Sequence, residues 1–162
     1  MSQDEYTGQR DAHYSVWHRT KSTRRYVGLE DAQLLAMVDI DVALYAEYDD
    51  GEKATLALVE TARDVGQSFK AATVLRDLAK RADIPAYVAL YKIGETPNPA
   101  NPMVNDIESF RVRQIWPAYT PWYTLTPEQW SKALLRIRRK ASLRLDAEDA
   151  DLVSQLDDGK SA

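Results

Sequence analysis

Hydrophobic and polar positions change their period several times along the chain, and these changes predict a series of helices and strands. Residues 13–36 favour one or two short helices. Residues 38–48 alternate between apolar and polar side chains, which is typical of a strand, and residues 53–61 predict a second strand. Asp50-Gly51 lies between these two segments, and an Asp-Gly pair in that place predicts a tight hairpin.

The second half of the chain continues this alternation of helices and strands. Thr126, Pro127 and Gln129 have the pattern of a helix start, with threonine as the N-cap and proline in the first turn. The predicted elements are an amphipathic helix over residues 65–82, a buried strand over 86–93, a loop over 94–105, an edge strand over 107–116 and a helix over 127–145.

This order of elements predicts an α+β fold with a central mixed sheet and helices packed on it. The segment from the second strand to the third is a strand–helix–strand crossover, which is expected to be parallel and right-handed. We expect a single domain over residues 1–145 and a flexible acidic tail over 146–162. The chain has no glycine-rich phosphate loop, so the common nucleotide-binding fingerprints are excluded.

The distribution of charge changes the range of possible partners. The whole chain has 21 basic and 25 acidic residues, but residues 146–162 contain six of the acids and one of the bases. The remaining segment has 20 basic and 19 acidic residues, so the net charge of −4 does not exclude nucleic acid as a partner.

Other residue types narrow the classes of protein further. The chain has no cysteine, which excludes disulfides, thiolate zinc sites and a cysteine nucleophile. It has two histidines, which leaves little for a histidine-rich metal site. It has no apolar run of about 18 residues and a polar N-terminus, so we expect no membrane partner and a cytoplasmic location, in a bacterial or phage-infected cell.

Acidic residues in the predicted hairpin are the strongest chemical signal. If Asp50 and Gly51 are the two turn residues, Asp41 lies opposite Glu60 and Asp39 lies opposite Ala62, all on one face of the sheet. Like charges opposite each other destabilise a sheet unless a cation lies between them, and Mg²⁺ is a natural candidate for such carboxylates. The alternative is a solvated strand face whose acids bind nothing.

Residues 38–91 also resemble the core of the PD-(D/E)xK nuclease superfamily. In that family a hairpin carries an Asp on its first strand and a Glu-x-Lys at the end of its second, followed by a helix and a strand. Asp41 matches the Asp, with Asp39 as an alternative, and Glu60 matches the Glu. The resemblance implies a restriction-endonuclease-like core of αβββαβ type, with Asp41, Glu60 and Asp39 binding Mg²⁺ or Mn²⁺ and DNA as the substrate.

The family's lysine would fall at position 62, where this chain has Ala62. Two interpretations follow. In the first, Lys70 on the next predicted helix takes the lysine's role, and Gln67 contacts the metal or the attacking water. In the second, catalysis has been lost and the domain binds DNA or protein, for example in a phage or mobile element.

Two further groups of residues bear on partners. The basic face of the last predicted helix could follow a phosphate backbone or could simply be solvated. Aromatic residues between positions 116 and 130 could stack on bases or could form a hydrophobic cluster beneath a loop; they are Trp116, Tyr119, Trp122, Tyr123 and Trp130. A homodimer or a larger complex remains open.

Overall fold

The computed structural model describes residues 24–35 and 40–158. The chain divides into two compact units, residues 1–39 and residues 40–162. In the first unit, the described residues form the short helices α2 (Arg24–Val27) and α3 (Leu29–Leu34), separated by Gly28 at a φ of 84°. Short helices were predicted in this region, and the described part confirms them.

The second unit is built on a five-stranded sheet in the order β1-β2-β3-β4-β5. The β2–β3 pair is parallel and the other three pairs are antiparallel. This arrangement confirms the predicted mixed sheet of an α+β fold and the parallel crossover through a helix. The elements are β1 (Val42–Glu47), β2 (Lys53–Arg63), α4 (Thr73–Ala82), β3 (Ala86–Asn98), β4 (Asn101–Trp116), β5 (Tyr123–Leu125) and α5 (Pro127–Asp158).

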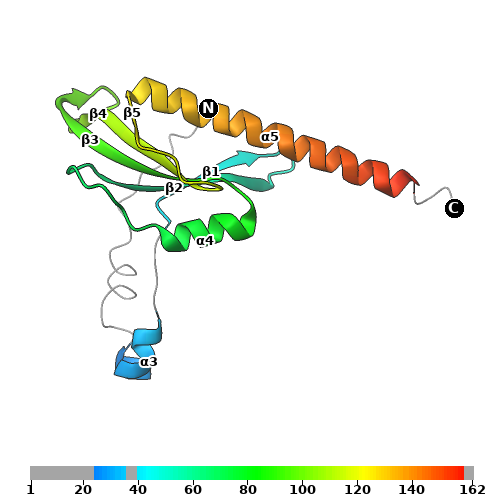
Figure 1. The fold of residues 1–162 in the computed structure, drawn as a ribbon, viewed down its shortest axis with the longest axis horizontal. Coiled ribbons are helices and arrows are strands. Elements are labelled where there is room, and N and C mark those ends of the chain that lie inside the picture. Colours follow the sequence, from blue (N-terminus) through cyan, green and yellow to red (C-terminus); the bar gives the residue numbers. More distant parts are fainter. Residues whose placement is uncertain (1–23, 36–39, 159–162) are drawn as a thin grey trace. The chain divides into compact units, whose positions relative to one another are not determined.

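Helices α4 and α5 cover opposite faces of this sheet (Figure 1). On the α4 face, Leu58, Leu75 and Leu90 belong to one buried hydrophobic cluster. On the α5 face, Val59 and Trp130 belong to a second. Leu58 and Val59 are neighbours on β2, so the alternation of a strand sends consecutive side chains into two different cores.

The β1–β2 hairpin keeps the predicted register by a different route. The loop consists of Asp49, Asp50 and Gly51, because Tyr48 and Glu52 form the last backbone pair and Gly51 has a φ of 86°. The predicted turn with Asp50 and Gly51 as its two central residues is therefore wrong. A bulge between Leu44 and Tyr45 compensates, and Val42 then pairs with Val59, as the prediction requires.

The helix predicted over residues 65–82 begins only at Thr73. Residues 64–72 form a loop, since Gly66 adopts a φ of 81° and the Asp64 carboxylate accepts a hydrogen bond from the Gly66 N–H. Val65 and Phe69, expected on the buried stripe of that helix, are 77% and 64% exposed. The prediction that Lys70 and Gln67 lie on a helix is therefore wrong.

The region predicted as a loop over residues 94–105 is mostly strand. β3 and β4 continue to Asn98 and from Asn101, and only Pro99 and Ala100 lie between them. The Asn98 side chain accepts a hydrogen bond from the Ala100 N–H at 2.8 Å, so asparagine supports a tight turn where its abundance suggested a long loop.

The predicted edge strand is not at an edge along its whole length. β5 pairs with β4 at Phe110, Arg111 and Val112, so this part of β4 lies between two strands. β5 is only Tyr123–Leu125 and follows a proline-containing loop, which leaves almost no alternating pattern to detect.

Helix α5 continues to Asp158, well beyond the predicted end near Leu145. The tail over residues 146–162 was predicted to be flexible, whereas residues up to Asp158 are helical; alanine and leucine between the acids favour a helix. The C-terminal part of α5 extends past the sheet (Figure 1). Among the described residues no helix is long and apolar enough to cross a membrane.

Candidate functional site

Glu60 lies near the end of β2, on the face covered by α4. Strand alternation places it between Leu58 and Ala62, and its side chain is only 12% exposed. The Lys70 ammonium nitrogen lies 2.9 Å from Glu60 Oε1, within reach of a charge-assisted hydrogen bond. A carboxylate this far from water needs such a partner, and the loop before α4 supplies it.

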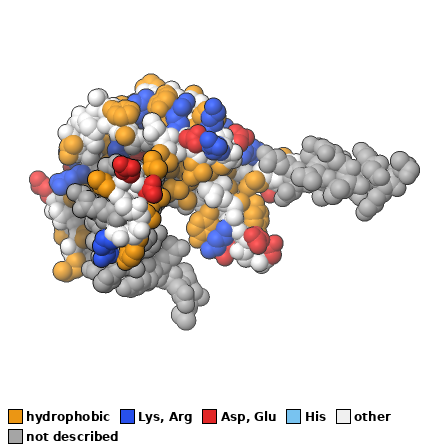
Figure 2. Space-filling model, turned by 90° about the horizontal axis from the view of Figure 1, so that it is seen from below, with side chains coloured by type: hydrophobic (Ala, Val, Ile, Leu, Met, Phe, Trp, Pro, Cys, Tyr) orange, Lys and Arg blue, Asp and Glu red, His pale blue; other side chains and the backbone are white. Residues whose placement is uncertain are grey.

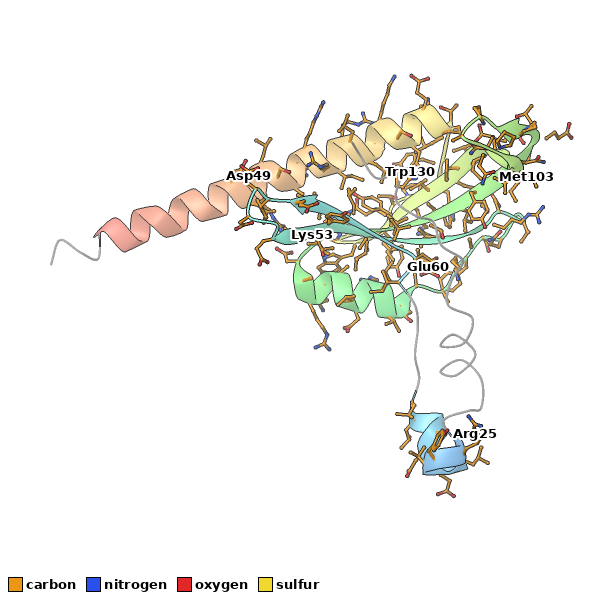
Figure 3. All side chains as sticks on the ribbon, turned by 180° about the vertical axis from the view of Figure 1, so that it is seen from behind. Arg25, Asp49, Lys53, Glu60, Met103 and Trp130 are labelled. Atoms are coloured by element: carbon orange, nitrogen blue, oxygen red, sulfur yellow. The ribbon has the colours of Figure 1, made fainter. Side chains whose placement is uncertain are left out.

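Figure 3 shows that Glu60 and Trp130 lie on opposite sides of the sheet. Trp130 lies between the sheet and α5, whereas Glu60 is beside the N-terminal part of α4. The polar pair and the aromatic core are thus separated by the sheet itself.

Asp41 immediately precedes β1 and accepts hydrogen bonds from Thr61, the residue that follows Glu60. Its Oδ2 accepts hydrogen bonds from the Thr61 backbone N–H at 2.9 Å and from Thr61 Oγ1 at 3.0 Å. The Val42–Val59 pair places Asp41 opposite Glu60 in register. Sequence analysis missed Thr61, although a hydroxyl next to Glu60, which is the expected partner of Asp41, was a usable signal.

Asp41 and Glu60 are opposite in register and have the ligand chemistry that a divalent cation takes, although the Thr61 hydroxyl that binds Asp41 alternates to the strand face opposite Glu60. Mg²⁺ usually takes one or two carboxylates and leaves its other positions to water and phosphate oxygens. Asp39 lies outside the described residues. Within residues 24–35 and 40–158, no group of three or more acidic or histidine side chains converges on one point. The fit therefore rests on the chemistry of two carboxylates and one nearby lysine.

Gln67 holds the loop before α4. Its side-chain oxygen accepts a hydrogen bond from the Val65 N–H at 2.7 Å, and its side-chain nitrogen donates to the Arg63 carbonyl at 2.9 Å. Both ends of the amide thus support the loop that carries Lys70. A contact between Gln67 and a metal or water stays a prediction.

Arg111 attaches the same loop to β4. Its guanidinium donates to both Asp64 carboxylate oxygens, at 2.8 and 3.0 Å, and to the Gln67 carbonyl at 2.6 Å. The hydrogen bond from Arg111, followed by that from the Gly66 N–H, lowers the pKa of the Asp64 carboxyl below its usual value. These three hydrogen bonds from Arg111, which we call the Arg111 fork, hold the loop that carries Lys70 against β4.

Arginine side chains and aromatic rings alternate beside Lys70, and we call this arrangement the arginine–aromatic ladder. Arg76 lies over Trp116 at 5.7 Å and over Tyr119 at 5.1 Å, measured from the guanidinium carbon to the ring centroid. Three further contacts continue the series: Arg113 over Tyr119 at 5.1 Å, Arg113 over Trp122 at 5.2 Å and Arg111 over Trp122 at 5.0 Å. Such contacts are attractive, by about 0.5–1 kcal/mol each at exposed sites.

The aromatic residues that sequence analysis grouped together separate in the structure. Trp116, Tyr119 and Trp122 belong to the ladder, whereas Trp130 packs with Tyr87 and Phe110 in the core beneath α5. The ladder fixes the β4–β5 loop, since Trp122 Nε1 donates to the Ser68 carbonyl at 3.2 Å. Trp116 and Trp122 also pack against the hydrophobic cluster on the α4 face, so the prediction of one cluster beneath a loop is wrong for Trp130, which lies in the other core.

An apolar cavity lies at the other end of β2. It has a volume of about 370 Å³, and Leu56, Ile84 and Ile137 contribute to its apolar wall. Lys140 and Arg144, from the basic face of α5, also line it, and burial raises the pKa of the Tyr87 hydroxyl in its wall. No carboxylate pair accompanies these groups among the residues that line the cavity.

Comparisons of the chain with protein-family models, curated proteins and solved structures found no match. The chemistry of Glu60, Lys70 and Asp41 is therefore the basis on which a function is assigned.

Proposed function

We propose that this chain is a metal-dependent nuclease that hydrolyses phosphodiester bonds of DNA, with a site of PD-(D/E)xK type. Asp41 and Glu60 would hold Mg²⁺ or Mn²⁺, and Lys70 would act beside them. The observation that carries the proposal is the 2.9 Å contact between Lys70 Nζ and Glu60 Oε1.

This contact addresses the main objection to a nuclease, which is Ala62 in the place of the motif lysine. Residues 60 and 62 lie on the same strand face, about 6.6 Å apart. Lys70 enters that face from the loop before α4, so an ammonium group is present near the acids without a lysine on the strand.

Each group has a defined part in the proposed reaction. The bound ion would polarise the phosphodiester and lower the pKa of a water molecule. Asp41 and Glu60 would orient that ion, and Thr61 would hold Asp41 through its two hydrogen bonds. Lys70 would stabilise the negative charge that develops on the phosphate oxygens in the transition state.

The test is hydrolysis of labelled DNA in the presence of Mg²⁺ or Mn²⁺, comparing the wild type with Glu60→Gln. Glu108→Gln is a matched control. Glu108 on β4 also pairs with a lysine, Lys92 on β3, at 3.0 Å, but both side chains are exposed. We expect Glu60→Gln to lower the rate at least 100-fold and Glu108→Gln to leave it unchanged. Equal rates in the two variants would refute the assignment.

A second candidate is a non-catalytic module that binds DNA or protein. Ala62 favours it, because this side chain packs against the hydrophobic cluster under α4, which leaves little room for a lysine on the strand. This candidate predicts DNA binding that is unchanged by EDTA, with no hydrolysis under any metal condition.

A further inference from the structure

Tyr119 is the aromatic residue of the arginine–aromatic ladder that is most exposed to solvent. The guanidinium carbons of Arg76 and Arg113 each lie 5.1 Å from its ring centroid, and the residue is 53% exposed. Two cations hold the ring, so its orientation is fixed while part of its surface faces solvent. A fixed and accessible aromatic ring is well suited to stacking.

Some guanidinium nitrogens of the ladder's arginines are not used in hydrogen bonds within the described part of the chain. Arg76 uses Nε to donate to the Ile115 carbonyl at 3.0 Å, which leaves its terminal nitrogens for another acceptor. Arg113 Nε is buried with no hydrogen-bond partner among the described residues. An acceptor that reached this nitrogen would satisfy a donor that the described part of the chain leaves without a partner.

Acidic residues near the ladder are already paired. Asp64 pairs with Arg111, Asp77 with Arg81, and Glu60 with Lys70. Lys80 also lies beside the ladder, with its ammonium nitrogen 6.0 Å from the Trp116 ring centroid. Within the described part of the chain, no carboxylate forms an ion pair with Arg76, Arg113 or Lys80. The described acids near Tyr119 are therefore engaged with other cations. Figure 2, which looks from the side of α4, shows hydrophobic, basic and acidic side chains interspersed on this face.

The shape of the site limits what can bind. A cavity of about 20 Å³ is lined by Lys70, Arg113 and Tyr119 among others, and it has room for about one water molecule. A planar group is therefore too large for this cavity and would have to stack on the exposed part of the Tyr119 ring. Bases in a duplex are covered by their neighbours, whereas an unpaired base offers its ring face.

From this geometry we infer that the arginine–aromatic ladder binds single-stranded DNA, with an unpaired base stacked on Tyr119 and phosphates bound by Arg76, Arg113 and Lys80. The inference rests on the proposed function in that it names the substrate class of the same site. Lys70 lines the small cavity beside Tyr119 and also contacts Glu60. A DNA strand bound to the ladder would therefore lie next to Glu60.

The test measures binding of a fluorescein-labelled 20-residue oligothymidylate by fluorescence anisotropy, in EDTA so that no hydrolysis occurs. We expect Tyr119→Ala to weaken binding roughly 5- to 100-fold, as the loss of one stacking contact does. Tyr119→Phe keeps the ring and should bind within about twofold of the wild type. Tyr123→Ala is the matched control, because Tyr123 is 54% exposed and lies near Tyr119 in the chain but outside the ladder.

Several results would overturn the inference. These are no binding of the oligonucleotide by the wild type, equal weakening by Tyr119→Ala and Tyr123→Ala, or a duplex of equal length that binds as tightly with the same dependence on Tyr119. Thermal unfolding of each variant shows whether it is folded. Quenching of tryptophan fluorescence in the wild type, by the oligothymidylate but not by the duplex, gives a readout that needs no variant.

Failure of this inference and failure of the proposed function have different signatures. If the ladder is right and the nuclease is wrong, binding in EDTA depends on Tyr119 but no DNA is cut with Mg²⁺ or Mn²⁺. If the nuclease is right and the ladder is wrong, hydrolysis depends on Glu60 while Tyr119→Ala binds and cuts as the wild type does.

Discussion

The two faces of the sheet differ in what they bury. Beneath α5, Trp130 packs with Tyr87 and Phe110 at ring distances of 6.3 Å, in an apolar core. Beneath α4, the same strands present an apolar core at one end and the Glu60–Lys70 pair at the other. A carboxylate held away from water usually costs stability unless it is paired, so the Glu60–Lys70 pair beside an apolar core is the feature of the α4 face that most needs an explanation.

The largest effect is expected on the α5 face. Trp130→Ala should lower the free energy of unfolding by about 3–5 kcal/mol, since it removes a large buried side chain and leaves a cavity. Trp122→Ala, on the ladder, should cost clearly less because Trp122 is only half-buried. Urea unfolding of both variants makes the comparison, and equal losses would mean that the ladder is as much a structural core as the α5 face.

The next effect belongs to Asp41. Asp41→Asn should lower metal-dependent hydrolysis by about 100-fold or more, because a neutral amide is a poor ligand for a hard cation. Stability should change by less than about 1 kcal/mol, since the amide oxygen can still accept from Thr61. A control is Asp77→Asn, which breaks an exposed pair on α4 and should leave the hydrolysis rate unchanged. Loss of stability without loss of hydrolysis would make Asp41 a structural residue.

A smaller effect is expected at Arg111. Arg111→Lys should lower the free energy of unfolding by about 1 kcal/mol, because lysine cannot reproduce the fork to Asp64 and the contact to the Gln67 carbonyl. Hydrolysis should fall together with stability, since this fork fixes the loop that carries Lys70. Chemical denaturation and the hydrolysis rate are measured on the same preparations, and an unchanged rate would show that the loop needs no such anchor.

The smallest effect is a pH dependence from Asp64. Its pKa is lowered in the folded protein, so its pair with Arg111 contributes stability at neutral pH and loses it as pH falls below about 3.9, the value in an unfolded chain. The difference in free energy of unfolding between wild type and Asp64→Asn should stay constant from pH 7 to about pH 5 and shrink at lower pH. A difference that does not change down to pH 2 would contradict the assigned pair.

Sequence patterns predicted the fold better on the strands than in the loops. The mixed sheet and the parallel crossover follow from apolar periodicity and chain order, and both are confirmed. The Asp41–Glu60 register was predicted from a wrong turn, and it is preserved because the extra loop residue and the bulge after Leu44 offset each other. A bulge is set by packing across the sheet and leaves little trace in a single sequence.

The candidate site was predicted only in part for related reasons. Lys70 was assigned to a helix because residues 65–82 have helical spacing, but Gly66 and the Asp64 side chain hold this segment as a loop. The arginine–aromatic ladder was missed because it joins α4, β4 and the β4–β5 loop, which are distant in sequence. Alternating charge on β4, at Arg111 and Arg113, indicated only an edge strand.

The most direct test of the account is the rate of DNA cleavage in a single turnover, with saturating Mg²⁺, for Lys70→Ala and Lys92→Ala. Both variants remove a lysine that pairs with a glutamate at about the same distance, 2.9 Å for Lys70 and 3.0 Å for Lys92, but only Lys70 contacts Glu60. The account predicts a loss of about 100-fold or more for Lys70→Ala and no change for Lys92→Ala. Equal rates in the two variants, or no cleavage by the wild type, would contradict it.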